Sequence, residues 1–221
     1  MNLDKLSIFN VDTIGVYCFT NNKYTLIPTG LSPEVKSKIR EVLATEVLEV
    51  HVAGTSLLGI MVAGNNNGIL LPRNVKEEEL REMKKLDLKV SVLNSKSTAL
   101  GNVILCNDKG AIVYPEMEKD SIKTIKEVLE VEELSSATIA DVITIGSVAV
   151  VTNKGALVHV DASDKDIKVL SNLLKVKVEV GTVNFGSPFI KSGVLANDKG
   201  IIVGTSTTGP EIVRIQRALG D

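Results

Sequence analysis

The sequence predicts an α+β protein built from five ββαβ units arranged in a ring. The first observation is a repeated pattern in which a glycine opens each unit and is followed by an apolar run, a polar turn and a second apolar run. The second is the spacing, because successive opening glycines are 44, 42, 45 and 47 residues apart. A near-constant period of this size is typical of one supersecondary unit repeated along a chain. The opening pairs are residues 14–15, 58–59, 100–101, 145–146 and 192–193.

The third unit shows the first part of the pattern clearly. Two apolar runs, Val103–Cys106 and Ala111–Tyr114, flank the turn Asn107–Gly110. Asn, Asp and Gly tolerate the positive φ values of tight turns, so this segment is predicted to be a β-hairpin. Runs that are apolar at every position indicate strands buried on both faces.

A helix and a third strand complete the unit. Ile122, Ile125, Val128 and Leu129 fall on one helical stripe, and a strand is expected near residues 137–139. The same order predicts helices in the other units. The first unit's helix is expected to start at Ser32, which is followed by Pro33, and the second unit's helix covers Lys76–Lys85. The fourth helix starts near Ser163, with Asp166 as its capping-box partner. The fifth starts near Thr208, which precedes Gly209 and Pro210.

The fifth unit lacks its last strand, because the sequence given ends just after the fifth helix. An N-terminal strand at 5–10 can supply it, which would seal the ring by pairing the two ends of the chain. No linker or low-complexity tract separates the units, so one domain covering 1–221 is expected. Its approximate unit boundaries are 11–54, 55–98, 99–141, 142–186 and 187–221.

Composition excludes several classes of protein. The net charge of −2 gives no general attraction to nucleic acid or to anionic lipid, and no segment approaches the roughly 20 apolar residues of a membrane span. The N-terminus has no secretory-signal pattern. Cys18 and Cys106 lie inside apolar runs, which indicates buried, reduced thiols. A cytoplasmic protein is therefore expected.

Short sequence motifs that follow one another in a fixed order through all five units resemble those of a known family. Five ββαβ units in a ring resemble the pentein-type β/α propeller. The motifs themselves resemble the archaeal and eukaryotic translation initiation factor 6 family, whose members are ribosome anti-association factors, and the resemblance implies an archaeal member. They are Val-Ala-Gly-Thr (52–55), Leu-Gly (58–59), Gly-Asn (64–65), Gly-Ile-Leu-Leu-Pro (68–72), Ala-Leu-Gly-Asn-Val (99–103), Cys-Asn-Asp (106–108), Thr-Ile-Ala-Asp (138–141), Gly-Ser (146–147), Gly-Ala-Leu-Val-His (155–159) and Gly-Thr-Val-Asn-Phe-Gly-Ser (181–187).

The resemblance implies a non-catalytic factor. Such a factor binds the large ribosomal subunit at its intersubunit face, prevents premature joining of the small subunit, and takes part in large-subunit biogenesis. The implied partner is mainly a ribosomal protein of the L14 type near the sarcin–ricin loop, with limited contact to rRNA. A monomer that needs neither membrane nor cofactor is expected.

Residues beside the opening glycines form the predicted binding face, since the pairs would meet at one end of the ring. Close backbone approach explains the glycines themselves equally well. Asn102 is placed at the centre, because its counterparts Val16, Ile60, Ser147 and Val194 are not amides. Family members often carry a basic residue where Ile60 stands. The full set of predicted ribosome-binding residues is Asn10, Gly15, Gly59, Ile60, Gly101, Asn102, Ser147 and Asn184; the turn asparagines 65, 107, 153 and 197 are assigned to hairpin structure instead.

An enzyme is the alternative, because pentein relatives include guanidine-modifying enzymes with a nucleophilic Cys. The candidate nucleophiles are Cys18 and Cys106, and the only histidines are His51 and His159. No sequence feature indicates an activating partner for either thiol. Metal-ligand spacings and a phosphate-binding loop are also missing, although the segment 205–209 could hold an anion at a helix start as well as cap that helix.

Overall fold

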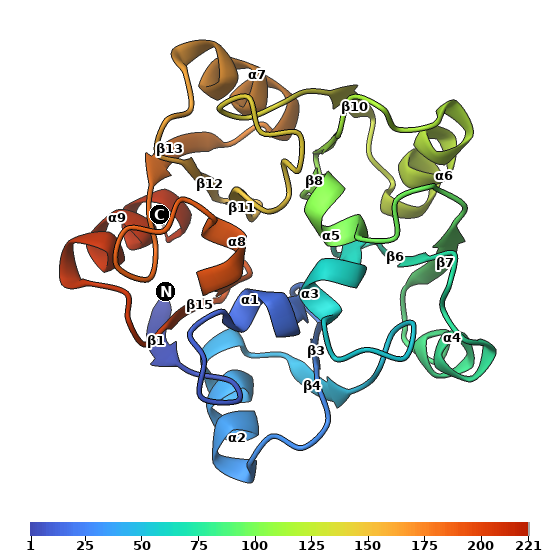
Figure 1. Cartoon of the computed structure of the whole chain (residues 1–221), viewed down its shortest axis with the longest axis horizontal. Helices are drawn as coiled ribbons and strands as arrows, with labels where there is room; N and C mark the ends of the chain where they lie inside the picture. The colour runs from blue at the N-terminus through green and yellow to red at the C-terminus, as the bar shows by residue number, and fades with distance from the viewer. Residues whose placement is uncertain (221) are drawn as a thin grey trace.

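The computed structural model describes residues 1–220. Within them it contains five three-stranded sheets, which Figure 1 shows set around a common centre with the long helices between them on the outside. The predicted end of the last unit, Asp221, lies outside the described residues. In the described part of the chain, no helix combines the length and apolar character needed to cross a bilayer.

The first unit has the predicted ββαβ order. Strand β2 (Phe19–Thr20) pairs antiparallel with β3 (Tyr24–Ile27), and helix α2 (Pro33–Leu43) leads to β4 (Glu46–Glu49), which pairs parallel with β3. Ser32 caps α2 as expected, since its hydroxyl accepts from the backbone N–H of Val35. Each sheet therefore has its second strand at the centre.

The next three units repeat this topology. The second unit contains β5 (Ala63–Gly64), β6 (Gly68–Pro72), α4 (Glu77–Met83) and β7 (Lys89–Leu93). The third contains β8 (Ile104–Cys106), β9 (Gly110–Val113), α6 (Lys119–Leu129) and β10 (Glu133–Ser136). The fourth contains β11 (Ala149–Val151), β12 (Gly155–His159), α7 (Asp164–Leu174) and β13 (Lys177–Gly181).

Two element boundaries differ from the sequence prediction. The second helix ends at Met83 and not at Lys85. The third strand of the third unit is β10, at residues 133–136, and not at residues 137–139. Three of its four residues are exposed, so the strand carries little apolar signal, whereas the fully buried Ile139 forms a turn with Val142.

The fifth unit contains β14 (Val194–Ala196), β15 (Gly200–Gly204) and α9 (Gly209–Leu219), and its third strand comes from the N-terminus. That strand, β1, covers Asn2–Leu6 and pairs parallel with β15. The expected strand at 5–10 is therefore placed too late along the chain. Residues 8–11 form a turn, in which Ile8 pairs with Val11 and the intervening Phe9 and Asn10 have positive φ.

Each long helix packs against the sheet of the preceding unit. Helix α6 lies on β6 and β7, α7 on β9 and β10, and α9 on β12 and β13. The first long helix, α2, follows the same rule with the fifth unit, because it packs on β15 and β1. The apolar stripes of the helices therefore fill the spaces between neighbouring sheets, and the core consists of Val, Ile, Leu and Ala clusters shared between units.

Four short helices, which the sequence did not predict, precede the first strands of four units. Their second residue is glycine in three of them, and the structure explains why: a Cβ on Gly59 would lie 1.8 Å from the carbonyl oxygen of Gly15. The helices thus meet near the centre with their backbones almost touching. They are α1 (Ile14–Tyr17), α3 (Leu58–Met61), α5 (Leu100–Val103) and α8 (Ile190–Gly193).

The hairpin turns form where predicted, but for a different physical reason. In the part of the chain described, no hairpin turn uses a positive φ. The Asn side chain shapes the turn, since Asn107 Oδ1 accepts from the backbone N–H groups of Lys109 and Gly110. Gly110 is needed for close approach, because a Cβ there would lie 2.1 Å from the carbonyl oxygen of Leu173 at the end of α7.

Candidate functional site: the helix face

The four short helices and the tight turns before them lie at one end of the molecule. Each first strand leaves a short helix, or the turn at 145–147 in the fourth unit, and runs to an Asn hairpin. The second and third strands both run back toward the short-helix end, since they pair parallel with each other and antiparallel to the first. We call this end the helix face. It consists of the short helices with the turns at 8–11, 52–55, 139–142 and 183–187, and Figure 1 looks onto it.

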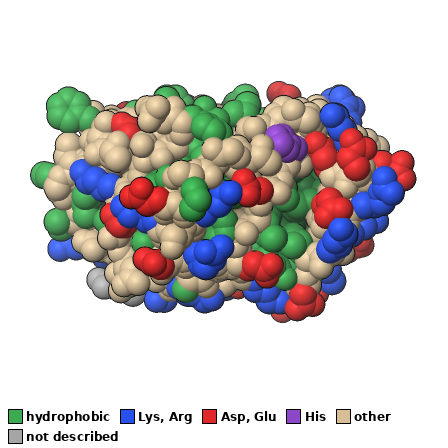
Figure 2. Space-filling model, turned by 90° about the horizontal axis from the view of Figure 1, so that it is seen from below, with side chains coloured by type: hydrophobic (Ala, Val, Ile, Leu, Met, Phe, Trp, Pro, Cys, Tyr) green, Lys and Arg blue, Asp and Glu red, His purple; other side chains and the backbone are tan. Residues whose placement is uncertain are grey.

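The helix face carries most of the exposed large apolar side chains. Phe185 is 83% exposed, Phe189 51% and Phe9 47%, so three of the chain's four phenylalanines point into solvent here. Figure 2 shows hydrophobic side chains along the upper edge, which is the face turned toward the reader in Figure 1, with charged side chains gathered lower and to the right. Exposed Phe side chains in such numbers are typical of a binding surface. The patch, which we call the apolar patch, comprises Phe9, Val11, Ile143, Phe185 and Phe189.

The turn that presents Phe185 is held in place by Glu211. The Glu211 carboxylate accepts from the backbone N–H groups of Phe185 (3.2 Å) and Gly186 (2.8 Å) and from the Thr182 hydroxyl (2.8 Å). It also accepts from the N–H of Thr208 in the capping box of α9 (2.7 Å). Of the two roles that the sequence allows for the segment 205–209, anion binding or helix capping, the structure shows capping. Burial alone would raise the pKa of Glu211, but these hydrogen bonds outweigh it and lower the pKa.

Other units use the same device. Glu79 of α4 accepts from the N–H groups of Ala53 and Gly54, and Asp166 of α7 accepts from that of Ala140. Each carboxylate also caps its own helix. Burial works against ionisation of Glu79 and Asp166, yet the backbone hydrogen bonds lower both pKa values. Three of the four helix-face turns, at 52–55, 139–142 and 183–187, are therefore each hydrogen-bonded to a carboxylate at the start of a helix behind them.

Asn184 links the fifth unit to the first. Its Nδ2 donates to the carbonyl oxygen of Asp12 (2.9 Å), and its Oδ1 accepts from the Thr207 hydroxyl (3.0 Å). The Asp12 carboxylate in turn accepts from the hydroxyls of Thr205 and Ser206, and those hydrogen bonds lower its pKa. This network brings the segments that carry Phe9, Val11 and Phe185 together. The Asn184 side chain itself is occupied within the fold.

The structure separates the predicted site residues into two groups. Gly15, Gly59 and Gly101 are buried between neighbouring short helices, where they allow close approach and offer no surface to a partner. Asn10 is exposed in the turn before α1, and Ile60 and Asn102 are half-buried on α3 and α5. Within residues 1–220 the Asn102 side chain has no hydrogen-bond partner, so its amide is available on the helix face.

Two assignments around Asn102 need correction or qualification. Val194 is not its counterpart, because it begins strand β14 and is 1% exposed. Helix α8 starts at Ile190 as α5 starts at Leu100, so Ser192 is the counterpart of Asn102 and the fifth opening pair is Ile190–Lys191. The Ser147 hydroxyl is used locally, since it donates to the carbonyl oxygen of Thr144 (2.6 Å).

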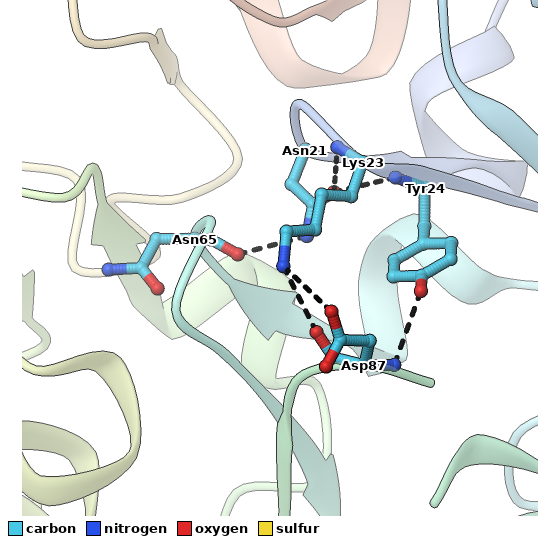
Figure 3. Close-up of polar contacts among 5 residues, drawn as sticks. All are labelled: Asn21, Lys23, Tyr24, Asn65 and Asp87. Atoms are coloured by element: carbon cyan, nitrogen blue, oxygen red, sulfur yellow. Dashed lines mark hydrogen bonds and ion pairs between the residues drawn. The ribbon is translucent and has the colours of Figure 1, made fainter. Parts of the chain in front are cut away.

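The hairpin asparagines lie at the end opposite the helix face. Figure 3 shows Asn21, whose Oδ1 accepts from the N–H groups of Lys23 and Tyr24 (both 2.8 Å) while its Nδ2 donates to the Asn65 carbonyl (3.0 Å). Lys23 and Tyr24 also bond to Asp87 in the next unit. Asn65 and Asn107 each donate to the next hairpin and to the last carbonyl of a long helix, Leu129 or Leu174.

The second turn residues form a continuous cycle of hydrogen bonds, which we call the hairpin ring. The N–H of each residue donates to the side-chain oxygen of the next, over distances of 2.7–3.0 Å. The last bond, from Asp198 to Asn22, spans the first and fifth units. The turn asparagines therefore serve the hairpins, as the sequence indicated. The members of the hairpin ring are Asn22, Asn66, Asp108, Asn153 and Asp198.

The thiols and imidazoles do not form a catalytic group. Cys18 is fully buried, and burial raises its pKa far above the usual range. Burial also raises the pKa of Cys106 to about 12, and its Sγ donates to the Gly64 carbonyl. His51 contacts Thr29 at the surface, and His159 Nδ1 accepts from the N–H of Asp161. Among residues 1–220 neither histidine contacts a thiol, so no imidazole is placed to make a thiolate nucleophile. Among residues 1–220, no cluster of three or more His, Cys, Asp or Glu side chains could hold a metal ion.

Comparison with solved structures supports the fold. One similar structure is the N-terminal domain of ArgZ bound to substrate; ArgZ is an arginine dihydrolase from the ornithine–ammonia cycle in cyanobacteria. The match covers 86% of this chain and 72% of the ArgZ domain, with a TM-score of 0.53 and 13% sequence identity. Full-length ArgZ in its apo form matches with the same TM-score, 12% identity, 86% of this chain and 30% of its own. At such identities the likeness concerns the fold alone.

Sequence comparison defines the family. The model of the eIF-6 family matches residues 3–218, so the chain belongs to this family. Among curated relatives, Translation initiation factor 6 of Saccharolobus solfataricus is 57% identical over the whole of both chains. The proteins of the same name from Sulfolobus acidocaldarius and Staphylothermus marinus are 49% and 48% identical, covering all of both chains in the first case and 99% and 98% in the second.

Proposed function

We propose that this protein is a non-catalytic translation factor that binds the large ribosomal subunit through its helix face and thereby keeps the small subunit from joining. Membership in the eIF-6 family supports a role in translation. The apolar patch is the observation that carries the choice of surface. In a chain with only four phenylalanines, exposing three of them on one face is costly unless a partner covers them.

A protein partner fits this surface better than RNA. The patch is aromatic and aliphatic, and the chain as a whole is slightly acidic, whereas proteins that follow RNA backbones present basic grooves. The patch therefore favours a protein as the main contact, and the resemblance to the eIF-6 family implies a ribosomal protein of the L14 type near the sarcin–ricin loop, with limited rRNA contact. Asn102, Ile60 and Asn10 extend this surface around the helix face. The proposed factor acts as a cytoplasmic monomer and takes part in large-subunit biogenesis.

The proposal includes a closed architecture in a single domain. We infer a pentein-type ring of five units, in which the pairing of β1 with β15, the packing of α2 on the fifth sheet and the last bond of the hairpin ring join the two ends. A closed ring would hold all helix-face turns in one rigid arrangement. Such preorganisation lowers the entropy lost on binding.

Co-sedimentation with purified large subunits tests the proposal. Replacing Phe185 and Phe189 together by Ser removes the two most exposed aromatic side chains of the apolar patch without touching the core, so folding is expected to be retained. Truncation of aromatic anchors at interfaces costs about 2 kcal/mol or more, which corresponds to at least a roughly 30-fold weaker affinity. The same variant should lose the ability to block subunit joining.

A matched control is Val213→Ser, because Val213 is 67% exposed on α9, an outer helix that is not part of the helix face as defined above. This variant should bind like the unchanged protein. Asn102→Ala tests whether the contact extends beyond the apolar patch, and it should weaken the affinity for the large subunit by several-fold. Unchanged binding by the double Phe variant, or equal losses in it and in the Val213 variant, would show that the surface has been assigned wrongly.

The alternative function, a guanidine-modifying enzyme, is supported only by the likeness of fold to ArgZ. The raised pKa values of Cys18 and Cys106 argue against it, because both thiols stay protonated. If Cys18 and Cys106 are both replaced by Ala, the proposed factor keeps its effect on subunit joining. An enzyme that uses either thiol as nucleophile would lose its activity completely.

A further inference from the structure

Lys191 occupies the position that glycine holds in the other four units. In those units a Cβ would strike a neighbouring backbone; on Gly146, for example, it would lie 2.2 Å from the carbonyl oxygen of Gly101. The fourth unit differs, since residues 145–147 form a turn and not a short helix. Lys191 follows this turn around the centre, and its N–H donates to the Ser147 carbonyl (3.2 Å). The repeat is therefore broken at one place, and a cationic side chain stands there.

The Lys191 side chain lines a cavity at the common centre of the five sheets. The cavity has a volume of about 70 Å³, and the first strands of all five units form its wall. It adjoins a second cavity of about 40 Å³, which is lined by the hairpin turns and shares Thr20, Gly64 and Cys106 with the first. We call the first the axial cavity. Its wall includes Phe19, Ala63, Leu105, Val150 and Leu195, one from each first strand.

The ammonium of Lys191 has no partner in the protein. Within residues 1–220, its Nζ makes neither a hydrogen bond nor an ion pair. Every side-chain nitrogen or oxygen that is sealed from solvent in these residues does have a partner, so the unpartnered Nζ is not sealed, and Lys191 is one of the residues that line the axial cavity. The residue is half-buried, and desolvation by the surrounding protein lowers the pKa of Lys191. A partly desolvated cation without a counter-charge is unfavourable.

The other ionisable groups at the centre do not neutralise Lys191. Cys106 is the nearest, and it stays a neutral thiol at physiological pH because burial raises its pKa to about 12. Asp108 and Asp198 line the second cavity, where their carboxylates accept from Asn66, Asn153 and Asn22. They leave the helix-face end of the centre positive and the hairpin end negative.

We propose that the axial cavity binds a small monovalent anion of the halide class, held by the ammonium of Lys191. One ammonium balances one negative charge, and the carboxylates at the hairpin end disfavour a second. The volume admits a halide together with a few water molecules. Apolar side chains from every unit form much of the wall, so a weakly hydrated anion such as bromide should bind more tightly than chloride. The anion would lie inside the axial cavity and not on the apolar patch.

Crystals grown in sodium bromide locate the site directly. The anomalous signal of bromide should give a peak within hydrogen-bonding distance of Lys191 Nζ inside the axial cavity. Bromide peaks confined to the outer surface would overturn the proposal, as would a cavity that contains water alone. The unchanged protein is used, so this test does not depend on the folding of any variant.

Thermal unfolding gives the corresponding test in solution. At a bromide concentration about five times the dissociation constant, the midpoint should rise by roughly 2–4 °C relative to gluconate at equal ionic strength. Lys191→Met keeps the length of the side chain and removes the charge, so this variant should no longer distinguish bromide from gluconate. Lys154→Met removes an exposed lysine in a hairpin turn and should respond like the unchanged protein. An identical response in all three proteins would mean that the anion acts at the surface.

Discussion

The close packing of the short helices makes a quantitative prediction for Gly59→Ala. The added Cβ would lie 1.8 Å from the Gly15 carbonyl oxygen and 2.6 Å from that of Cys18. Carbon and oxygen atoms approach to about 3.3 Å even in favourable contacts, so a gap of roughly 1.5 Å must be made. Both obstructing atoms belong to the backbone of α1 or its C-cap, and α3 is held on its other side by α5.

The cost of this substitution follows from the lack of room on either side. Overpacking typically costs 1–3 kcal/mol, and a clash with fixed backbone lies at the upper end, so we expect a loss of about 3 kcal/mol or more in the free energy of unfolding. For a chain of this length each kcal/mol lowers the midpoint of thermal unfolding by about 2–4 °C. Differential scanning calorimetry should therefore show a fall of about 6–12 °C.

A second glycine provides the control. A Cβ on Gly209, in the first turn of α9, meets no atom within 4 Å. Alanine has the higher helix propensity and loses less backbone entropy on folding, so Gly209→Ala should raise the midpoint slightly or leave it unchanged. If Gly59→Ala unfolds within about 2 °C of the unchanged protein, the short helices can move apart to accommodate the Cβ at little cost, and the close-approach argument fails.

Two further predictions concern polar groups. Asp198→Ala leaves the Asn153 and Asn22 donors of the hairpin ring without an acceptor. This variant should lower the free energy of unfolding, measured in urea, by about 2 kcal/mol. Asp198→Asn supplies an amide oxygen of the kind present at Asn22, so it should restore most of the lost stability. Glu211→Gln tests the lowered pKa of Glu211. The native pKa lies below the unfolded value of about 4.3, so the ionised carboxylate stabilises the folded state. This stabilisation is complete above about pH 5 and is lost as the pH falls through the native pKa. The variant should therefore be less stable at pH 7 by about 1–2 kcal/mol and should match the unchanged protein near pH 2; a deficit that is the same at both pH values would contradict this account.

The repeat could be predicted from the sequence because its signals are local. Turn asparagines and apolar runs identify the hairpins, and Ser32, Ser163 and Thr208 mark helix starts correctly. The mechanism behind the turn glycines could not be inferred, since Gly110 is required by the end of α7, more than sixty residues away. Exposed third strands such as β10 also escape detection, because partly solvated strands carry few apolar residues.

The proposed binding surface was harder to predict than the fold. The opening glycines share a pattern and so attracted attention, yet Gly15, Gly59 and Gly101 are buried. Phe185 was noted only as part of a motif, although an aromatic residue between Asn and Gly in a turn is itself a sign of exposure. The fifth unit was misaligned by two residues because Lys191 replaces the expected glycine. That substitution removes the signal by which the other units align.

The pairing of β1 with β15 has a consequence for the dynamics of the chain. In an open array of repeats the terminal units have one uncovered side, and they fray first. Here the strand at Asn2–Leu6 and the helix α2 cover the fifth sheet, so in the closed ring that we propose neither terminal unit would have an uncovered side. Amide hydrogen exchange should therefore be about equally slow in the central strands of all five units. Removing residues 1–6 should turn this uniform protection into a gradient that starts at the fifth unit.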